Sequence, residues 1–485
     1  MANYRSPGVY VEEISLLPPS IAEVESAVPA FIGYTEKAKI RTDDDILNVP
    51  TPISSWSDFI QYYGGPETEN AANISITVNE LRTGTVTTGF NVTVTPTTGA
   101  MSKHIFYYAI KLFFANGGGS CYITSIGKYT PAPVSPKADF LGGLELVGKE
   151  DAPTMLVIPE AIFLSQADFD EVNQAMLKQA SDMKDRFAIL DTHITTVPKV
   201  AGSVVSDSKT GIDNVPSDGS IRRYGAIYYP FLETTYKYAF DFGALTLTAH
   251  TVNGAGPAAA GVTDMTGKTL SFIQSNASLM YNAIDAEYGK YHIVLPPSSA
   301  MAGVYTRVDK DRGYWKAPAN VSVMNVAKAA ISVARSEQDL LNINTETGKS
   351  VNAILNVPGS GAVVMGARTL DGNDNEWKYI NVRRFFNVVE ESIKKSTSWV
   401  VFEPNVASTW TKVQAMIENY LFVKWRDGAL AGVKPEQAYE VRVGLGKTMT
   451  AADILEGKMI VEIAMAVSRP AEFIILRFEH KLQQS

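Results

Sequence analysis

Short apolar runs that alternate with an amphipathic helical pattern constrain the fold of this chain most. Residues 154–160 (TMLVIPE) and 186–191 (RFAILD) each have the composition of a buried strand. Between them, residues 165–185 place four apolar side chains on one helical face: Phe169, Val172, Met176 and Ala180. A third apolar strand follows within residues 222–232. This order predicts an α/β fold with α+β features, in which mixed sheets are flanked by helices.

Two segments interrupt this pattern. Residues 70–100 contain the stretches NISITVNE and GFNVTVTPTTG, which alternate strictly, are rich in Thr and carry few charges. They predict a β-hairpin insertion on the surface. Residues 241–270 contain the alternating stretch ALTLTAHTV and the flexible loop NGAGPAAAG, and predict a second insertion.

Further elements follow from local signals. Ala30–Tyr34 and residues 121–126 are predicted strands, and residues 103–119 and 275–289 contain predicted helices. A helix near residues 56–63 has Ser54 or Ser55 as its cap and Gly64 or Gly65 as its stop.

The last third contains two predicted helices and three predicted strands. The first helix, within residues 375–399, carries Val382, Phe386, Val389 and Ile393 on one face. The second, within residues 408–428, ends at Gly428 and has an apolar face formed by Trp410, Val413, Ile417, Tyr420, Leu421 and Trp425. The strands lie within residues 439–445, 459–467 and 471–480.

The chain begins with a strand that has no obvious partner. Apolar residues alternate over Val9–Ile14, and the sequence Leu-Leu-Pro-Pro follows at residues 16–19. Two prolines cannot take a central place in a sheet, and no hairpin signal follows them. The start of a chain usually frays unless something holds it, so this strand needs a partner from elsewhere.

Composition narrows the function classes. The chain has 485 residues, enough for a large core and for about three domains at roughly 150 residues each. Its net charge of -8 argues against a protein that mainly binds nucleic acid. Cys121 is the one cysteine, so no disulfide forms within the chain. We see no signal-peptide pattern, and no apolar run reaches the ~18 residues that span a bilayer, since Glu462 and Arg469 interrupt the best stretch.

Two glycine-rich motifs resemble nucleotide-binding loops but lack required residues. In GLGKTMT (residues 444–450), the first glycine of a phosphate loop would fall at Val441, inside a strand pattern. A tight turn with an exposed Lys447 is the preferred interpretation. In GSGAVVMGA (residues 359–367), the third glycine of a dinucleotide fingerprint would fall at Val364. We expect a turn or close backbone packing there.

Other chemically active residue types do not form a site in the sequence. Cys121 begins an apolar strand, which favours a buried core thiol over a nucleophile. The five histidines are isolated and lack metal-ligand spacing: His104, His193, His250, His292 and His480. The acidic run at residues 42–46 lacks the pattern of a calcium loop, so a solvated loop is expected, with weak cation binding second. We therefore predict no cofactor, no metal and no catalytic residue.

Several longer blocks resemble the contractile tail sheath proteins of bacteriophages and phage-tail-like injection particles. They are the opening stretch YRSPGVYVEEI and the blocks at residues 112–123, 311–320, 354–370, 377–405, 425–441 and 470–480. The blocks keep the family's order over nearly the whole chain. Tyr314 departs from the family, where a smaller residue is common, and the two insertions lie outside the family blocks.

The resemblance implies a structural and mechanical protein rather than an enzyme. Family members stack as six-fold rings in a helical tube around an inner tube, on a baseplate and beneath terminal cap proteins, and contract to drive the tube through a target envelope. It also implies a division into an N-terminal arm (1–25), an N-terminal and middle region (26–345), a C-terminal sheath domain (346–468) and a C-terminal strand arm (469–485). Synthesis and assembly in the bacterial cytoplasm are expected, with no membrane insertion and no direct contact with nucleic acid.

The resemblance further implies that the arms pair with neighbouring copies. The predicted N-terminal contact residues are Val9, Tyr10, Val11, Glu12 and Ile14, and the C-terminal ones are Glu472, Phe473, Ile475, Arg477 and Phe478. Strand addition to an open sheet edge would supply the affinity. Pairing of both strands within one subunit is the alternative. For the inner tube, the family uses a helix of the C-terminal domain, which here carries Arg383, Arg384, Lys394 and Lys395. A solvated helix face is the alternative for these cations.

Two other function classes stay open at this stage. An α/β enzyme would place polar catalytic groups at strand ends in a sheet crevice, and a static filament would share the terminal strands without changing length. The sequence also leaves open whether the particle is a phage, a bacteriocin, an extracellular injection particle or an anchored secretion machine. A single-chain sheath favours a phage or a phage-like injection particle.

Overall fold

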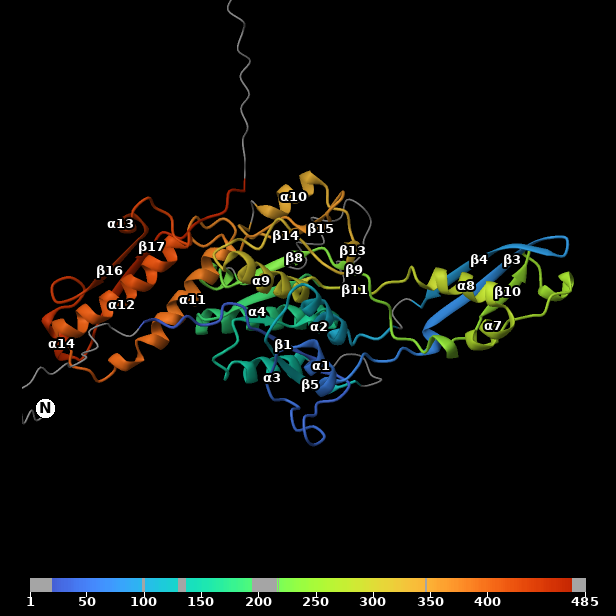
Figure 1. Cartoon of the computed structure of the whole chain (residues 1–485), viewed down its shortest axis with the longest axis horizontal. Helices are drawn as coiled ribbons and strands as arrows, with labels where there is room; N and C mark the ends of the chain where they lie inside the picture. The colour runs from blue at the N-terminus through green and yellow to red at the C-terminus, as the bar shows by residue number, and fades with distance from the viewer. Residues whose placement is uncertain are drawn as a thin grey trace, which may run out of the picture. The chain divides into compact units, whose positions relative to one another are not determined.

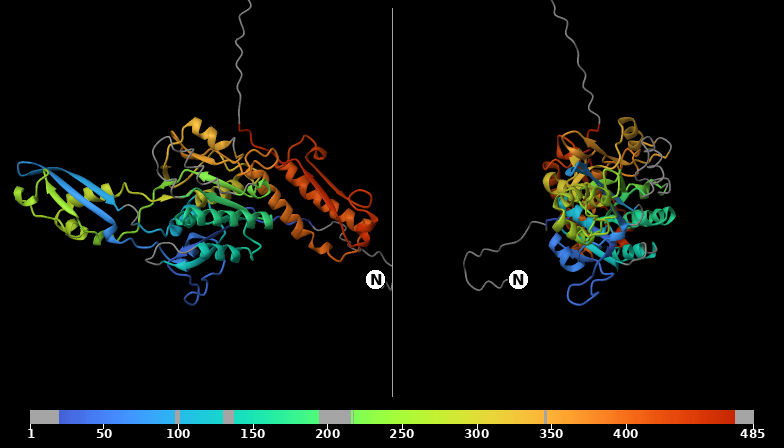
Figure 2. Two further views of the ribbon diagram at one scale, coloured as in Figure 1. Left: turned by 180° about the vertical axis from the view of Figure 1, so that it is seen from behind. Right: turned by 90° about the vertical axis from the view of Figure 1, so that its right-hand side faces the viewer.

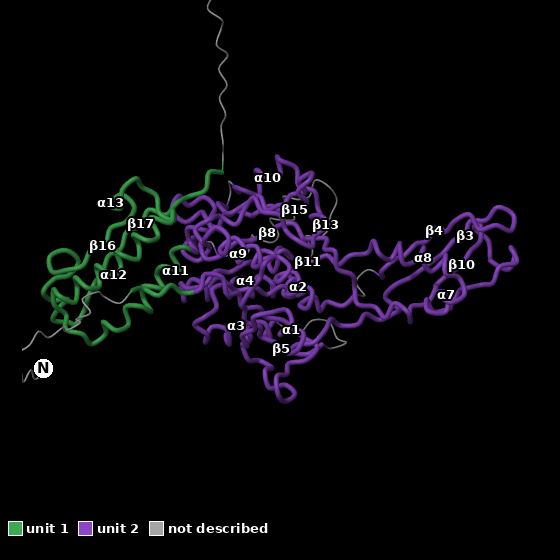
Figure 3. Tube along the Cα trace, in the orientation of Figure 1, with its two compact units in different colours: residues 1–24, 385–485 green, residues 25–384 purple. Residues whose placement is uncertain are grey.

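The structure is a computed structural model that describes residues 20–97, 101–129, 137–193, 216, 218–344 and 347–472. The chain divides into two compact units (Figure 3). Unit 1 comprises residues 1–24 and 385–485, and unit 2 comprises residues 25–384.

A nine-stranded sheet forms the centre of unit 2, in the order β12-β15-β14-β8-β7-β6-β1-β5-β2. Figure 1 labels five of its strands, β15, β14, β8, β1 and β5. The strands from β14 to β5 in this order run parallel, and antiparallel strands close both edges. The strands are β1 (Pro29–Thr35), β2 (Thr51–Ile53), β5 (Cys121–Lys128), β6 (Met155–Val157), β7 (Phe187–Asp191), β8 (Gly225–Tyr229), β12 (Val321–Ser322), β14 (Asn352–Val357) and β15 (Gly361–Val364). The predicted mixed sheet is confirmed.

Helices cover both faces of this sheet. Successive residues of a strand point to opposite faces. Ile32 of β1 faces Gly143 of α3 (Lys137–Val147), while its neighbour Gly33 faces Phe106 of α2 (Phe106–Ala115). Thus α2 and α3 lie on opposite faces, where α2 packs with α9 (Ser298–Arg312) and α3 packs with α4 (Gln166–Met183).

The α4 face and the predicted helix ends are confirmed. Phe169, Val172, Met176 and Ala180 are all buried in the core. Helix α1 (Trp56–Tyr63) begins after Ser55, whose hydroxyl accepts a hydrogen bond from the Asp58 N–H, and ends at Gly64. Further strands and α-helices of unit 2 are β9 (Leu232–Thr234), β11 (Val294–Leu295), β13 (Val326–Ala329), α6 (Gly219–Arg222) and α10 (Arg335–Asn342).

The two predicted insertions form one small domain with its own core. Strands β3 (Ile74–Thr83) and β4 (Val86–Pro96) make the predicted hairpin, seen from behind in Figure 2. From the second insertion, β10 (Ala249–Val252) adds to β3 in parallel. Helices α7 (Leu270–Asn276) and α8 (Ser278–Tyr288) supply Ile273 and Ile284 to the core of this sheet. We call this set of elements the insertion domain.

The described part of unit 1 contains α-helices and a two-stranded sheet. Its helices are α12 (Ala407–Arg426), α13 (Pro435–Ala438) and α14 (Ala451–Leu455), together with most of α11 (Ile380–Ser396), and its strands are β16 (Tyr439–Val443) and β17 (Val461–Met465). On α12 the predicted apolar face is confirmed, with Val413, Ile417 and Leu421 buried. Gly428 follows the C-cap Asp427 and adopts a φ of 87°, as the predicted stop of the helix.

Adjacent glycines of α3 provide a matched test of the packing against the sheet. A Cβ on Gly143 would lie 2.7 Å from methyl carbons of both Ile32 and Ile126, whereas a Cβ on Gly142 meets nothing within 4 Å. We expect Gly143→Ala to lower the free energy of unfolding by ~1–2 kcal/mol, because overpacking exceeds the gain in helix propensity. Gly142→Ala should instead raise it by ~0.5–1 kcal/mol. Urea unfolding of both variants checks this, and equal effects would contradict the packing.

Candidate assembly site

The two-stranded sheet of unit 1 leaves both outer edges open within the described residues. Strands β16 and β17 pair with each other over five residues, from Tyr439 opposite Met465 to Val443 opposite Val461. Val441 and Val443 are buried, and β16 packs on α12. A two-stranded sheet is only marginally stable alone, and an open edge is a template for another strand. Among the described residues, both edges of this sheet are therefore candidate positions for further strands.

An apolar groove of about 740 Å³ lies beside β17. Val461 and Ile463 of β17 line it, but no residue of β16 does, so the groove lies on the β17 side. Met459, just before β17, also lines the groove, and further apolar walls come from α11, α12 and the loop between them: Ile393, Val400, Val401, Phe402, Val413 and Ile417. Phe402 is fully exposed and holds a φ of 70°, which bulky residues rarely adopt. Exposed apolar surface of this kind marks an interaction site.

Residues 20–24 lie along α11 and α12 in the same unit. The Ala22 and Val24 N–H groups donate to the hydroxyls of Ser396 and Ser392, each over 3.1 Å. The Glu23 carboxylate accepts a hydrogen bond from the Lys424 ammonium over 2.6 Å. We call this the root segment, because residues 1–19 precede it directly.

The predicted arm residues lie mostly outside the described part of the chain. Val9, Tyr10, Val11, Glu12 and Ile14 do so, as do Phe473, Ile475, Arg477 and Phe478; Glu472 is described and half-buried. Arm pairing therefore stays a prediction. Both segments connect to unit 1, the unit that contains the open sheet edges.

The four cations predicted to contact an inner tube separate into two groups. Arg383 and Arg384 are 2% and 3% exposed. Arg383 lies over the Trp377 ring, and Arg384 forms two hydrogen bonds with Asp309. These arginines are enclosed within the subunit, so we correct the prediction by removing them. Lys394 and Lys395 have 72% and 44% exposed side chains and share Glu391 as an ion-pair partner.

Buried carboxylates occupy the carboxyl ends of the parallel strands, where α/β enzymes bind ligands. Glu160 follows β6 and accepts hydrogen bonds from the N–H of Tyr34 on β1 and of Phe106, the first residue of α2. Asp191 ends β7 and accepts one from the N–H of Ser298, the first residue of α9. Each helix N-terminus thus receives a carboxylate of the protein itself. Burial raises the pKa of Glu160, and it raises the pKa of Asp191 to about 7 although Ser298 hydrogen bonds lower it.

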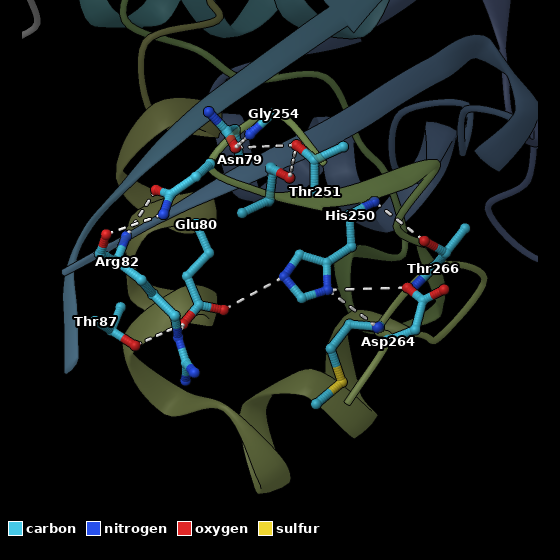
Figure 4. A network of polar contacts seen from close by, with 12 residues as sticks. Asn79, Glu80, Arg82, Thr87, His250, Thr251, Gly254, Asp264 and Thr266 are labelled. Carbon is cyan, nitrogen blue, oxygen red and sulfur yellow. Dashed lines mark hydrogen bonds and ion pairs between the residues drawn. The ribbon is translucent and has the colours of Figure 1, made fainter. Parts of the chain in front are cut away.

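The insertion domain contains a polar network around His250 (Figure 4). The His250 ring accepts the Met265 N–H at Nδ1, while its Nε2 lies 3.4 Å from a Glu80 carboxylate oxygen. Burial opposes ionisation of Glu80, but donors from Thr87 and Arg82 outweigh burial and lower its pKa. The network joins β3 to β10, so this histidine serves the fold. Within the described residues, no group of three His, Cys, Asp or Glu side chains could hold a metal ion.

The glycine-rich motifs are turns, as predicted. Gly359 and Gly361 have positive φ angles and lie in the turn from β14 to β15. Lys447 is exposed in a tight turn after β16.

Cys121 is 1% exposed, and burial raises the pKa of its thiol, which fits an inert core residue. No helix among the described residues is both long and apolar enough to span a bilayer.

Comparisons with known proteins agree with this architecture. The family of the phage tail sheath C-terminal domain matches residues 372–481. The chain is 27% identical to a chain of the PVC sheath complex of an extracellular contractile injection system in the contracted state, with a TM-score of 0.62 and 99% of each chain covered. The chain belongs to the contractile tail sheath family.

Further relatives support this assignment. A chain of the contracted helical sheath of the anti-feeding prophage (AFP) is 28% identical, with a TM-score of 0.60, over 99% of the present chain and all of that chain. The tail sheath protein of Enterobacteria phage T4 is 28% identical over 214 residues, or 42% of this chain. That match spans 30% of the phage protein's length. This is a structural, non-enzymatic family.

Asp191 should make the stability of this sheath subunit depend on pH. Its folded pKa of about 7 exceeds the usual value of ~3.9, so the folded chain binds a proton that the unfolded chain loses. The contribution of this proton to the free energy of unfolding is fully present below about pH 4 and is lost as the pH rises through 7. In urea unfolding, we expect the free energy of unfolding of the wild type to fall by up to ~1.4 kcal/mol per pH unit over this range because of Asp191. Asp191→Asn should remove this slope.

Asp182→Asn is the control, because that carboxylate is 62% exposed. It should retain the wild-type slope. Equal slopes in wild type and Asp191→Asn would contradict the assignment to Asp191.

Proposed function

We propose that this sheath subunit polymerises as helically stacked six-fold rings around an inner tube and contracts to drive the tube through a target envelope. The similar PVC and AFP chains were solved in sheath complexes in the contracted state, and an AFP chain of 28% identity was solved in a baseplate. The proposed partners are further copies, the inner tube, the baseplate and terminal cap proteins. Assembly would take place in the bacterial cytoplasm, in a phage tail or an injection particle.

One observation carries the self-assembly part: the open β16–β17 sheet lies beside an apolar groove. A strand added to the β17 edge would form main-chain hydrogen bonds with that edge. Its alternate side chains would point toward Ile463 and the groove, where burial of apolar surface is favourable at ~25 cal/mol per Å². The sheet would gain the additional strands that a stable β structure requires.

Both predicted arms contain the apolar, strand-forming residues that pairing with the β17 edge requires. Val9–Ile14 alternates, and residues 473–478 are apolar on both faces apart from Arg477. We propose that arms of neighbouring copies extend the β16–β17 sheet, with the C-terminal strand as the candidate neighbour of the N-terminal one. A head-to-tail contact of this kind does not close and therefore generates a filament.

Removal of residues 1–15 should abolish polymer formation, because the strand that links copies is lost. Negative-stain electron microscopy of the full chain should show long hollow tubes, and the truncated chain should remain as discrete subunits with an unchanged circular dichroism spectrum. Val9→Asp with Val11→Asp should act like the truncation. Ala2→Asp with Ser6→Asp is the matched control outside the strand and should polymerise. Normal tubes from the truncated chain would overturn arm pairing.

The receiving edge is tested by two neighbouring residues of β17. Ile463 lines the groove, whereas Ala464 is exposed on the opposite face. Ile463→Asp should prevent polymerisation and Ala464→Asp should not.

The diameter of the polymer tests contraction. A polymer of one invariant diameter in every preparation would indicate a static filament rather than a contractile sheath.

Lys394 and Lys395 are the proposed contacts with the inner tube. They are exposed near the end of α11, and exposed ion pairs contribute only ~0–1 kcal/mol each, which suits a contact that must release during contraction.

We expect Lys394→Glu with Lys395→Glu to reduce co-assembly of tube and sheath several-fold, as measured by co-sedimentation at low salt. Lys412→Glu with Lys447→Glu makes the same charge change at exposed positions of the same unit and should leave co-assembly unchanged. Equal co-assembly of the two double variants would remove these lysines from the contact.

A further inference from the structure

The chain is held with very different strength on the two sides of Glu25. On the N-terminal side, Ala22 and Glu23 of the root segment are exposed, and Ile21 and Val24 are half-buried. The Ala22 and Val24 N–H groups donate to serine hydroxyls, and the Glu23 carboxylate accepts from Lys424 and from the Tyr420 hydroxyl. The Glu23 side chain is 34% exposed, but Lys424 is 8% exposed, so release leaves one largely buried ammonium without this carboxylate. We expect the root segment to separate from α11 and α12 at a lower cost than the anchor in unit 2, where both members of an ion pair are buried.

On the C-terminal side, residues 26–28 are anchored in the interior of unit 2. The Ser26 hydroxyl donates to Asp309, and its carbonyl accepts from Arg384 over 3.0 Å and from the Thr154 hydroxyl over 3.0 Å. Val28 is 5% exposed, and its N–H donates to the Thr154 hydroxyl over 2.8 Å. The Asp309–Arg384 pair is itself buried, so loss of this anchor would leave charges without a partner away from water.

We propose that the root segment is a releasable length of tether, which detaches from α11 and α12 while residues 26–28 stay fixed. Release of five residues would extend the N-terminal arm by ~17 Å, since an extended chain spans at most ~3.3–3.6 Å per residue. The inference rests on the proposed function, because it concerns the arm that connects copies. A link between copies whose spacing changes needs such a reserve, or it breaks.

The residues that set the release are Ser392, Ser396 and Lys424. They act as positioning residues: while they hold the root segment, the arm starts from Ser20, and after release it starts from Glu25. Both serines contact backbone groups of the segment, so their effect does not depend on the side chains of Ala22 and Val24. Lys424 is largely buried and contacts Glu23, and so fixes the register of the segment along α12.

Amide hydrogen exchange of the full chain, followed by mass spectrometry, tests the graded attachment. In the isolated subunit, we expect the hydrogen-bonded amides of residues 22 and 24 to exchange at least tenfold faster than the amide of Val28, which donates to Thr154. Ser392→Ala with Ser396→Ala should accelerate residues 22 and 24 several-fold further and leave residue 28 unchanged. Ser398→Ala with Ser408→Ala, at exposed serines of the same unit, is the matched control and should change neither. Equal protection of residues 22, 24 and 28 would overturn the proposal.

A second measurement connects release to assembly. Amide exchange is compared between tubes of the full chain in the long lattice and in the contracted lattice. The amides of residues 22–24 should be protected from exchange in one of these lattices and should exchange at least tenfold faster in the other. Equal protection in both would overturn the tether while arm pairing stands. Normal polymerisation after removal of residues 1–15 would instead overturn arm pairing, and the exchange pattern of the isolated subunit would still decide whether the segment is releasable.

Discussion

The buried ion pair of Arg384 with Asp309 is the interaction on which much of unit 2 depends. It joins the first turns of α11 to α9, and α9 packs on strands β6 and β7 of the central sheet. The Arg384 guanidinium also lies 4.8 Å from the centre of the Tyr305 ring, whose hydroxyl bonds with that of Tyr228 on β8. Removal of one member of such a pair costs about 3–5 kcal/mol, because the remaining charge stays buried. One charged group thus links a helix, the sheet and the segment that leads to the N-terminal arm.

The sequence predicted the parts of the fold that local patterns determine. Strand β1, the capped helix α1, the face of α4 and the hairpin β3–β4 follow from periodicity and end signals. The pairing of β10 with β3 was not predicted, because strands far apart in sequence carry no local signal of their partner. Asn253, which accepts from the Arg82 N–H and donates to the Arg82 carbonyl, is a polar turn residue in the sequence and reveals its partner only in the fold.

The sequence predicted how the assembly site works, by strand addition, but not which residues form it. The family blocks and the terminal strands indicated assembly by strand addition, but the groove beside β17 combines residues of two helices, a loop and a strand. Arg383 and Arg384 show a specific limit: the sequence presents them as cations outside the apolar helix face, whereas ring and carboxylate partners from other elements enclose them. Lys394 and Lys395, about three turns later on α11, have similar charge and remain accessible. Composition alone does not separate the two pairs.

The insertion domain has a consequence for how sheaths of this kind can diversify. Its sheet is complete only when β10, from one insertion, lies beside β3, from the other, and both contribute to one core that is separate from the main core. A change of length or sequence in one insertion alone would expose part of that core or leave Glu80 without His250. The two segments therefore depend on each other for a complete sheet and core, although 143 residues separate Pro96 from Phe240 in the chain. They would be gained, lost or exchanged together, while the rest of the subunit stays unchanged.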